Sequence, residues 1–153
     1  MSTKLAGVLV LILTCASLAI ASGPYQVNLG HLLSLVQEVK LDGEEVSVVD
    51  IYADYPTYKP VVAKGEGFAC VDDAARAAVL LIRYNEVFEK HENDVIIDGL
   101  LKFLMRMQTK DGYFYNFVKN DAGTIEINTD GRTSVASFGW WAARALWALG
   151  EAA

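Results

Sequence analysis

The fold is decided by residues 65–89, whose sequence is GEGFACVDDAARAAVLLIRYNEVFE. Two glycines break the chain at the start of this stretch, and Asp72 or Asp73 then supplies a side chain suited to capping a helix. From Ala74 to about Glu89 the apolar residues occupy most sides of a helix rather than one stripe. The stretch therefore predicts a long helix that is buried on most of its surface.

Two further helices and a β-hairpin are predicted after this stretch. A helix runs from about residue 93 to 109. Its apolar residues recur at helical spacing: Ile97, Leu100, Leu101, Leu104 and Met107. Residues 113–118 and 124–127 predict two strands joined by a polar turn that ends in glycine. A last helix begins around residues 134–138 and continues to the C-terminus.

The chain before residue 65 alternates short elements. A helix is expected after Asn28 and should end near Lys40, since apolar residues there are three and four positions apart. Residues 41–43 form a turn, and the β-branched residues of 46–51 predict an extended segment. Residues 52–60, with three tyrosines and two prolines, are expected to be irregular.

One short motif occurs twice. The sequence DDAARA at residues 72–77 is echoed by WWAARA at residues 140–145, which places Arg76 and Arg144 68 positions apart. This offset suits a repeat made of one helical hairpin and a decorated loop. Coincidence between two alanine-rich helices is the alternative explanation.

The N-terminus, Met1–Ala21, has the three parts of a secretory signal peptide. Lys4 precedes an almost unbroken apolar run over residues 5–18, and Ala19–Ala21 offers a cleavage site. The run is shorter than the ~20 residues of a spanning helix, and the residues before Cys15 suit lipid attachment poorly. The sequence therefore predicts a secreted or periplasmic protein with no stable membrane insertion after cleavage.

Charge and cysteine content exclude several classes of partner. Loss of Lys4 leaves 12 Lys and Arg against 19 Asp and Glu, a net charge of −7. Nucleic acids and anionic membranes need a basic face, so neither is expected as a partner. Cys70 would be the single cysteine after cleavage and is predicted to be a buried packing residue. No zinc, phosphate-loop or Ser-His-Asp pattern occurs, so we expect no metal and no cofactor.

Four segments together resemble the six-hairpin, or (α/α)6-toroid, superfamily, which includes many glycoside hydrolases. They are residues 65–77 with their DD-x-AR-A helix start, 101–117, 129–134 and 144–150. The resemblance implies a mostly α fold: an incomplete α/α toroid of helical hairpins with a small β-hairpin insertion. It divides the exported chain into an N-terminal helix and extended segment, 22–60, and a partial toroid domain, 61–153.

The sequence is too short for the complete fold that it resembles, because a toroid closes only when all six hairpins are present. This sequence ends within its last predicted helix, whose apolar residues Leu146 and Trp147 would lack a neighbouring hairpin. We expect the sequence to be the N-terminal part of a longer chain, whose remaining hairpins would cover this face. Assembly with other chains is the alternative.

Glycoside cleavage needs two carboxyl groups, and the sequence offers four candidates. Asp73 and Asp72 lie at a helix start, where the helix dipole lowers the pKa of a carboxyl and suits it to act as a base or nucleophile. Alternatively, one caps the helix and the other pairs with Arg76. Asp130, in a Gly-flanked polar loop, is the second carboxylate candidate, or a turn former. Glu66 is the remaining candidate, ranked after these.

Aromatic and polar residues near loops supply candidate sugar contacts, because sugar rings stack on flat apolar faces while their hydroxyls take polar side chains. The candidates are Tyr52, Tyr55, Tyr115, Asn116, Arg132 and Trp140. Ordinary core packing is the alternative for the aromatic members. Arg132 could hold the carboxylate of an acidic sugar, or a neighbouring aspartate.

These features predict an exported carbohydrate-active protein resembling a glycoside hydrolase, with an oligo- or polysaccharide as partner and carboxylate acid/base catalysis. As the fragment it is expected to be, the chain would not work alone. A glycan-binding module without catalysis and a polysaccharide lyase, which would abstract a proton with Tyr, His or Arg, are the alternatives.

Overall fold

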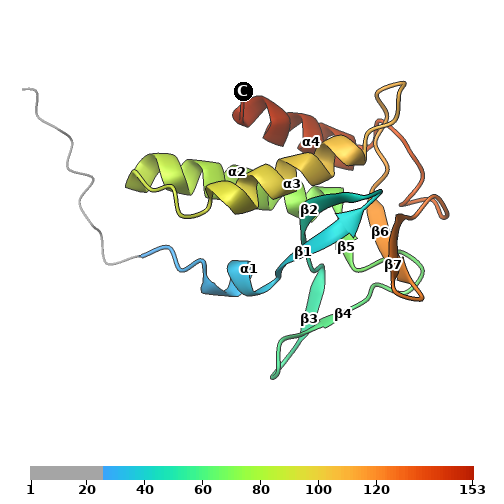
Figure 1. Ribbon diagram of the computed structural model, residues 1–153, viewed down its shortest axis with the longest axis horizontal. Helices are drawn as coiled ribbons and strands as arrows, with labels where there is room; N and C mark the ends of the chain where they lie inside the picture. The colour runs from blue at the N-terminus through green and yellow to red at the C-terminus, as the bar shows by residue number, and fades with distance from the viewer. Residues whose placement is uncertain (1–25) are drawn as a thin grey trace, which may run out of the picture.

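The computed structural model describes residues 26–153, which form a layer of helices lying against several small sheets (Figure 1). The predicted signal peptide, Met1–Ala21, lies outside the described residues. No helix of the described part is long and apolar enough to cross a membrane.

Three long helices form the helical layer. They are α2 (Val71–Phe88), α3 (Asp94–Arg106) and α4 (Trp140–Glu151). α2 lies between the other two, with α3 antiparallel and α4 parallel to it (Figure 1). The parallel direction is confirmed by ion pairs near both ends, because Arg144 Nε lies 3.4 Å from Asp72 Oδ1 and Arg83 Nε lies 2.5 Å from Glu151 Oε1. The repeated motif thus occurs at matching heights on neighbouring helices.

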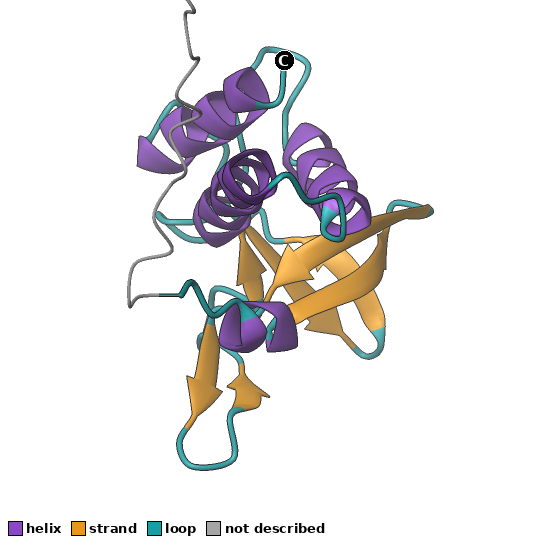
Figure 2. Cartoon of the chain, turned by 90° about the vertical axis from the view of Figure 1, so that its left-hand side faces the viewer, coloured by secondary structure: helices purple, strands orange, loops and turns teal. Residues whose placement is uncertain are grey.

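The strands form three small antiparallel sheets. β1 (Val36–Leu41) pairs with β2 (Glu44–Val49), and β3 (Tyr52–Asp54) pairs with β4 (Lys59–Val61). The third sheet has the order β5 (Ala69–Cys70), β6 (Phe117–Asp121) and β7 (Thr124–Ile127). Figure 2 shows the strands gathered on one side of the helices, together with the short helix α1 (Gly30–Ser34).

Two-residue turns close two of these hairpins. Asp42 and Gly43 both have positive φ, 50° and 87°, as do Ala122 and Gly123, at 48° and 95°. Paired positive φ values match the right-handed twist of the flanking strands. Both turns agree with the sequence analysis.

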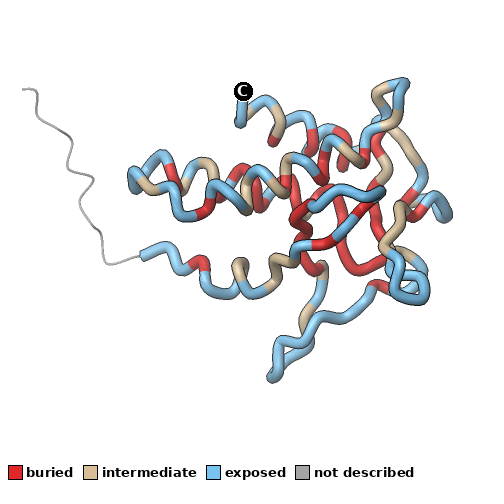
Figure 3. Tube along the Cα trace, viewed as in Figure 1, coloured by how far each residue is buried: buried red, intermediate tan, exposed pale blue. Residues whose placement is uncertain are grey.

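The core lies between the helices and the sheets (Figure 3). Its largest fully buried side chains include Phe103, Phe114, Leu41, Leu81 and Leu100. Trp141 Nε1 donates a hydrogen bond of 2.7 Å to the carbonyl of Phe114, which ties the start of α4 to the loop before β6. α2 buries nine of its 18 residues, and Leu80, Val87 and Phe88 are exposed, so the predicted helix is confirmed but its burial is less complete than expected.

The expected mostly α fold, an incomplete α/α toroid, is wrong. About 38% of the described chain is helical and about 27% is strand, so the fold is mixed. The sequence analysis expected a single β-hairpin, inserted between helices. In the structure a further hairpin, β1–β2, packs on α3 and supplies the core residues Leu41, Val46 and Val48. Long-range pairing and burial, rather than local propensity, decide such strands.

Three local expectations also need correction. The first helix ends at Ser34, not near Lys40, because residues 36–41 pair with β2. Residues 52–61 contain the β3–β4 hairpin rather than irregular chain. The residue that precedes α2 is Cys70, and neither aspartate caps the helix.

The packing of β2 on α3 depends on Gly99. A Cβ built on Gly99 would lie 2.9 Å from the backbone nitrogen of Ser47 and 2.8 Å from its Cβ, which no shift of a flexible side-chain end relieves. Replacement of Gly99 by alanine should therefore destabilise the fold by about 1–3 kcal/mol, measured as the free energy of unfolding in urea.

Gly150 in α4 is the matched control, since a Cβ there meets nothing within 4 Å. Replacement of Gly150 by alanine should stabilise the fold by up to about 1 kcal/mol through helix propensity. Equal effects at both glycines would contradict the close approach of β2 and α3.

Candidate functional site

A hollow of about 280 Å³ lies between α1 and α2, and two carboxylates line it. Asp50 lines it from the segment after β2, and Asp73 from the first turn of α2. The other lining residues are Leu32, Leu35, Val49, Ile51, Arg76, Ala77 and Leu80. This α1–α2 hollow is therefore mostly apolar, with two acids and one base. Asp50 also lines a separate hollow of about 220 Å³ together with Gln37.

Asp50 is a buried carboxyl, only 3% exposed. Gln37 Nε2 donates to its two oxygens at 2.6 and 2.5 Å. Burial raises the pKa of Asp50, and the bond from Gln37 opposes the rise but does not cancel it. Asp50 is therefore the acid of the hollow that is more readily protonated than an ordinary aspartate.

Asp73, by contrast, forms an ion pair. Arg76 Nη2 lies 2.6 Å from Asp73 Oδ1, and the Cys70 thiol donates to Asp73 Oδ2 at 3.3 Å. Arg76 also pairs with Asp72, so the two neighbouring aspartates share one guanidinium group. Asp50 and Asp73 thus line one hollow with different partners, Gln37 for Asp50 and Arg76 for Asp73.

Asp72 is occupied by structural ion pairs. Its Oδ2 lies 2.5 Å from Arg76 Nη2, and its Oδ1 lies 3.4 Å from Arg144 Nε. Oδ1 is buried and makes no hydrogen bond to the described residues. Burial raises the pKa of Asp72, while Arg76 and Arg144 oppose the rise. Both aspartates pair with Arg76, so the expected split between a cap and an ion pair is not observed.

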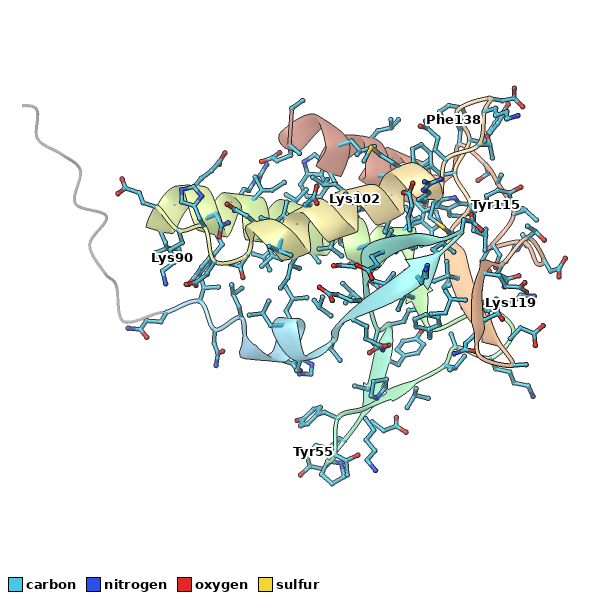
Figure 4. All side chains as sticks on the ribbon, in the orientation of Figure 1. Tyr55, Lys90, Lys102, Tyr115, Lys119 and Phe138 are labelled. Atoms are coloured by element: carbon cyan, nitrogen blue, oxygen red, sulfur yellow. The ribbon has the colours of Figure 1, made fainter. Side chains whose placement is uncertain are left out.

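Three exposed tyrosines belong to the β3–β4 hairpin and its turn, and none of them lines the α1–α2 hollow. Tyr52, Tyr55 and Tyr58, on or beside the β3–β4 hairpin, are 56%, 83% and 52% exposed; we call this element the tyrosine hairpin. The rings of Tyr58 and His31 of α1 lie 5.3 Å apart between centroids, so the hairpin contacts the helix that lines the hollow. Figure 4 labels Tyr55 at the end of the hairpin that points away from the helices.

Asp130 does not line the same hollow as Asp73. It lines a second hollow of about 270 Å³ with Glu66 and Lys119, formed by the segment between β4 and β5, by β6 and by the loop after β7. Glu66 accepts a hydrogen bond of 2.6 Å from Thr133 Oγ1, which holds it in place. The two carboxylates chosen from sequence as a catalytic pair therefore line different hollows.

The remaining predicted sugar contacts are also dispersed. Asn116 is fully buried and donates to the Thr133 carbonyl at 3.0 Å, and Tyr115 is half-buried against the core. Arg132 is exposed in the loop before α4. Trp140, 55% exposed, begins α4 with its ring edge against Trp141. None of these six residues lines the α1–α2 hollow.

Asp50 is the residue that sequence reasoning missed. The available signal was a lone carboxylate directly after the β-branched residues Val48 and Val49, just before the tyrosine-rich segment. A charged residue at the end of an apolar strand is an ordinary boundary, so only the tertiary structure distinguishes Asp50 by its burial.

Residues 26–153 contain no cluster of three or more His, Cys, Asp or Glu side chains that could hold a metal ion. The chain matches no protein-family model and no curated protein. The resemblance to the six-hairpin superfamily is therefore wrong, because it finds no support from a family match and the three sheets contradict the toroid it implies.

The buried Asp50 predicts a pH-dependent stability. Its pKa is higher in the folded chain than its ordinary 3.8, so the folded state binds more protons and loses stability as pH rises through that range. The substitution Asp50→Asn removes this loss while keeping a similar shape. Urea unfolding should show that the stability of Asp50→Asn relative to the wild type increases from about pH 3.5 to about pH 7.

The exposed Asp121, the last residue of β6, is the control for this measurement. The variant Asp121→Asn should follow the wild type at both pH values. A gap between Asp50→Asn and the wild type that stays constant with pH would contradict the raised pKa.

Proposed function

We propose that this protein is exported and acts on an oligo- or polysaccharide as a glycoside hydrolase, using the α1–α2 hollow as its site. The observation that carries the proposal is that two carboxyl groups line one hollow, Asp50 with a pKa raised by burial and Asp73 in an ion pair with Arg76. Glycoside cleavage uses two carboxyl groups of this kind, one protonated and one ionised.

Asp50 is suited to the role of general acid, because burial favours its protonated form. It would give its proton to the glycosidic oxygen as the bond to the leaving sugar breaks. Asp73 is the candidate for the complementary role, because it lines the same hollow and forms an ion pair with Arg76. It would activate a water molecule or attack the sugar carbon directly.

The tyrosine hairpin supports a saccharide as the ligand. Its exposed rings offer flat apolar faces, with Asp54 and Lys59 between them to take hydroxyl groups, and Tyr58 contacts His31 of the helix α1. The formal net charge of −6 favours a neutral saccharide over a strongly acidic one.

Binding without catalysis is the second candidate, and one observation favours it. Each carboxyl of the hollow already has a partner within the chain, Gln37 for Asp50 and Arg76 for Asp73. Side chains held in this way could shape a binding surface and take no part in proton transfer. The same tyrosine hairpin would then hold the sugar.

The carboxylate pair is tested by Asp50→Asn and Asp73→Asn, assayed by release of reducing ends from soluble starch, xylan and glucomannan. Each should lower the rate by about 100-fold or more, since general acid and base groups contribute 10²–10⁴-fold. Asp121→Asn is the matched control and should keep full activity. Saccharide binding without turnover in the wild type would select the second candidate, and a product with new ultraviolet absorbance would indicate a lyase.

The tyrosine hairpin is tested by Tyr52→Ala and Tyr55→Ala in a binding assay such as isothermal titration calorimetry. Each should weaken saccharide binding by about 2–10-fold, in line with the 0.5–1.5 kcal/mol of an aromatic contact. Tyr113, also exposed but outside the hairpin, provides the control Tyr113→Ala. An equal loss at Tyr113 would mean that the sugar does not bind along the hairpin.

A further inference from the structure

A larger hollow, of about 520 Å³, lies where α2 and α4 end and α3 begins. Figure 4 labels Lys90 at this end of α2, away from the sheets. The half-buried side chains of Ile82, Ile97 and Leu101 contribute an apolar floor. Four acidic side chains line its rim against one lysine and one histidine: Glu86, Glu89, Asp94, Glu151, Lys90 and His91. We call this feature the acidic groove.

The backbone adds negative charge to the same place. α2 and α4 run parallel, so the carbonyl ends of both helices meet at the acidic groove. Neither helix has a basic residue in its last turn. Glu86 lies in the last turn of α2, Glu89 follows that helix, and Glu151 ends α4, although helix C-termini are stabilised by cations. The negative charges of these residues therefore lie at positions where they destabilise α2 and α4.

Cations within the chain neutralise only part of this charge. Arg83 pairs with Glu151 at 2.5 Å, Lys90 pairs with Glu92 outside the groove at 3.3 Å, and His91 lies 3.1 Å from Asp94. Glu86 and Glu89 are exposed, and their carboxylates accept no hydrogen bond from the side chains described. An apolar floor beside two such carboxylates complements a ligand that is both aliphatic and cationic.

We infer that the acidic groove binds a cationic amphipathic peptide segment of a partner protein. Its aliphatic side chains would cover Ile82, Ile97 and Leu101, and its Lys or Arg side chains would pair with Glu86 and Glu89. Helix-in-groove recognition combines an apolar stripe with charges beside it in this way. The inference is independent of the proposed function, because none of the residues that line the α1–α2 hollow lines the acidic groove.

The probe is a fluorescein-labelled helical peptide of leucine and lysine, about 14 residues long so that a helix can form on the groove. Fluorescence anisotropy should show binding to the wild-type chain that weakens as NaCl is added, because salt screens exposed charges. A peptide with glutamate in place of each lysine should not bind. Equal binding of the two peptides would overturn the inference.

The double variant Glu86→Lys with Glu89→Lys should bind the peptide about tenfold more weakly, since charge complementarity across a binding surface is lost. Its melting temperature should be unchanged or higher, because lysine suits a helix C-terminus. The milder pair Glu86→Gln with Glu89→Gln should give an intermediate loss and guards against misfolding of the first variant.

The matched control is Glu38→Lys with Asp121→Lys, which changes the net charge equally at exposed positions outside the groove. It should keep its affinity for the peptide. An equal loss in this control would show attraction to overall charge and would overturn the inference, as would unchanged affinity in the Glu86 and Glu89 variants.

Discussion

The burial of α2 on most of its sides is the constraint on which the rest of the structure depends. Its four buried alanines, Ala74, Ala75, Ala77 and Ala78, add little bulk, so neighbouring elements can approach closely. α3 and α4 pack along it, and β2 and β5 contact it from the sheet side. These elements cover the alanine-rich part of α2, while Leu80, Val87 and Phe88 stay exposed.

The two ends of α2 have opposite electrostatic character, and each lies beside one of the hollows discussed. At its start, Asp73 and Arg76 face the α1–α2 hollow beside the positive end of the helix dipole. At its end, carboxylates and carbonyl groups gather around the acidic groove. The parallel course of α4 strengthens this polarity, because its dipole adds to that of α2. One helix thus separates a proposed catalytic hollow from a proposed peptide-binding groove.

Periodic, strongly apolar segments were predicted well, and segments whose structure depends on distant partners were not. α2, α3, the β6–β7 hairpin and the Asp42-Gly43 turn follow from spacing and turn chemistry within a few residues. Residues 36–41 were expected to be helical, yet pairing with β2 makes them a strand. The candidate site was predicted less well: Asp73 lines the α1–α2 hollow, but Asp130 lines another, no predicted sugar contact lines the first, and Asp50 was missed.

The sequence by itself determined the long buried helix, the helix that follows it, the β-hairpin before α4 and the position of Asp73 and Asp72 in the first turn of α2. These features depend on residues close together in the chain, whose periodicity and turn preferences act locally. Only the tertiary structure decided that β1–β2 packs on α3, that Asp50 is buried in the same hollow as Asp73, and that α2 and α4 end together at an acidic groove. Those outcomes depend on which apolar surfaces bury one another, and burial between residues far apart in the chain leaves no local pattern to read.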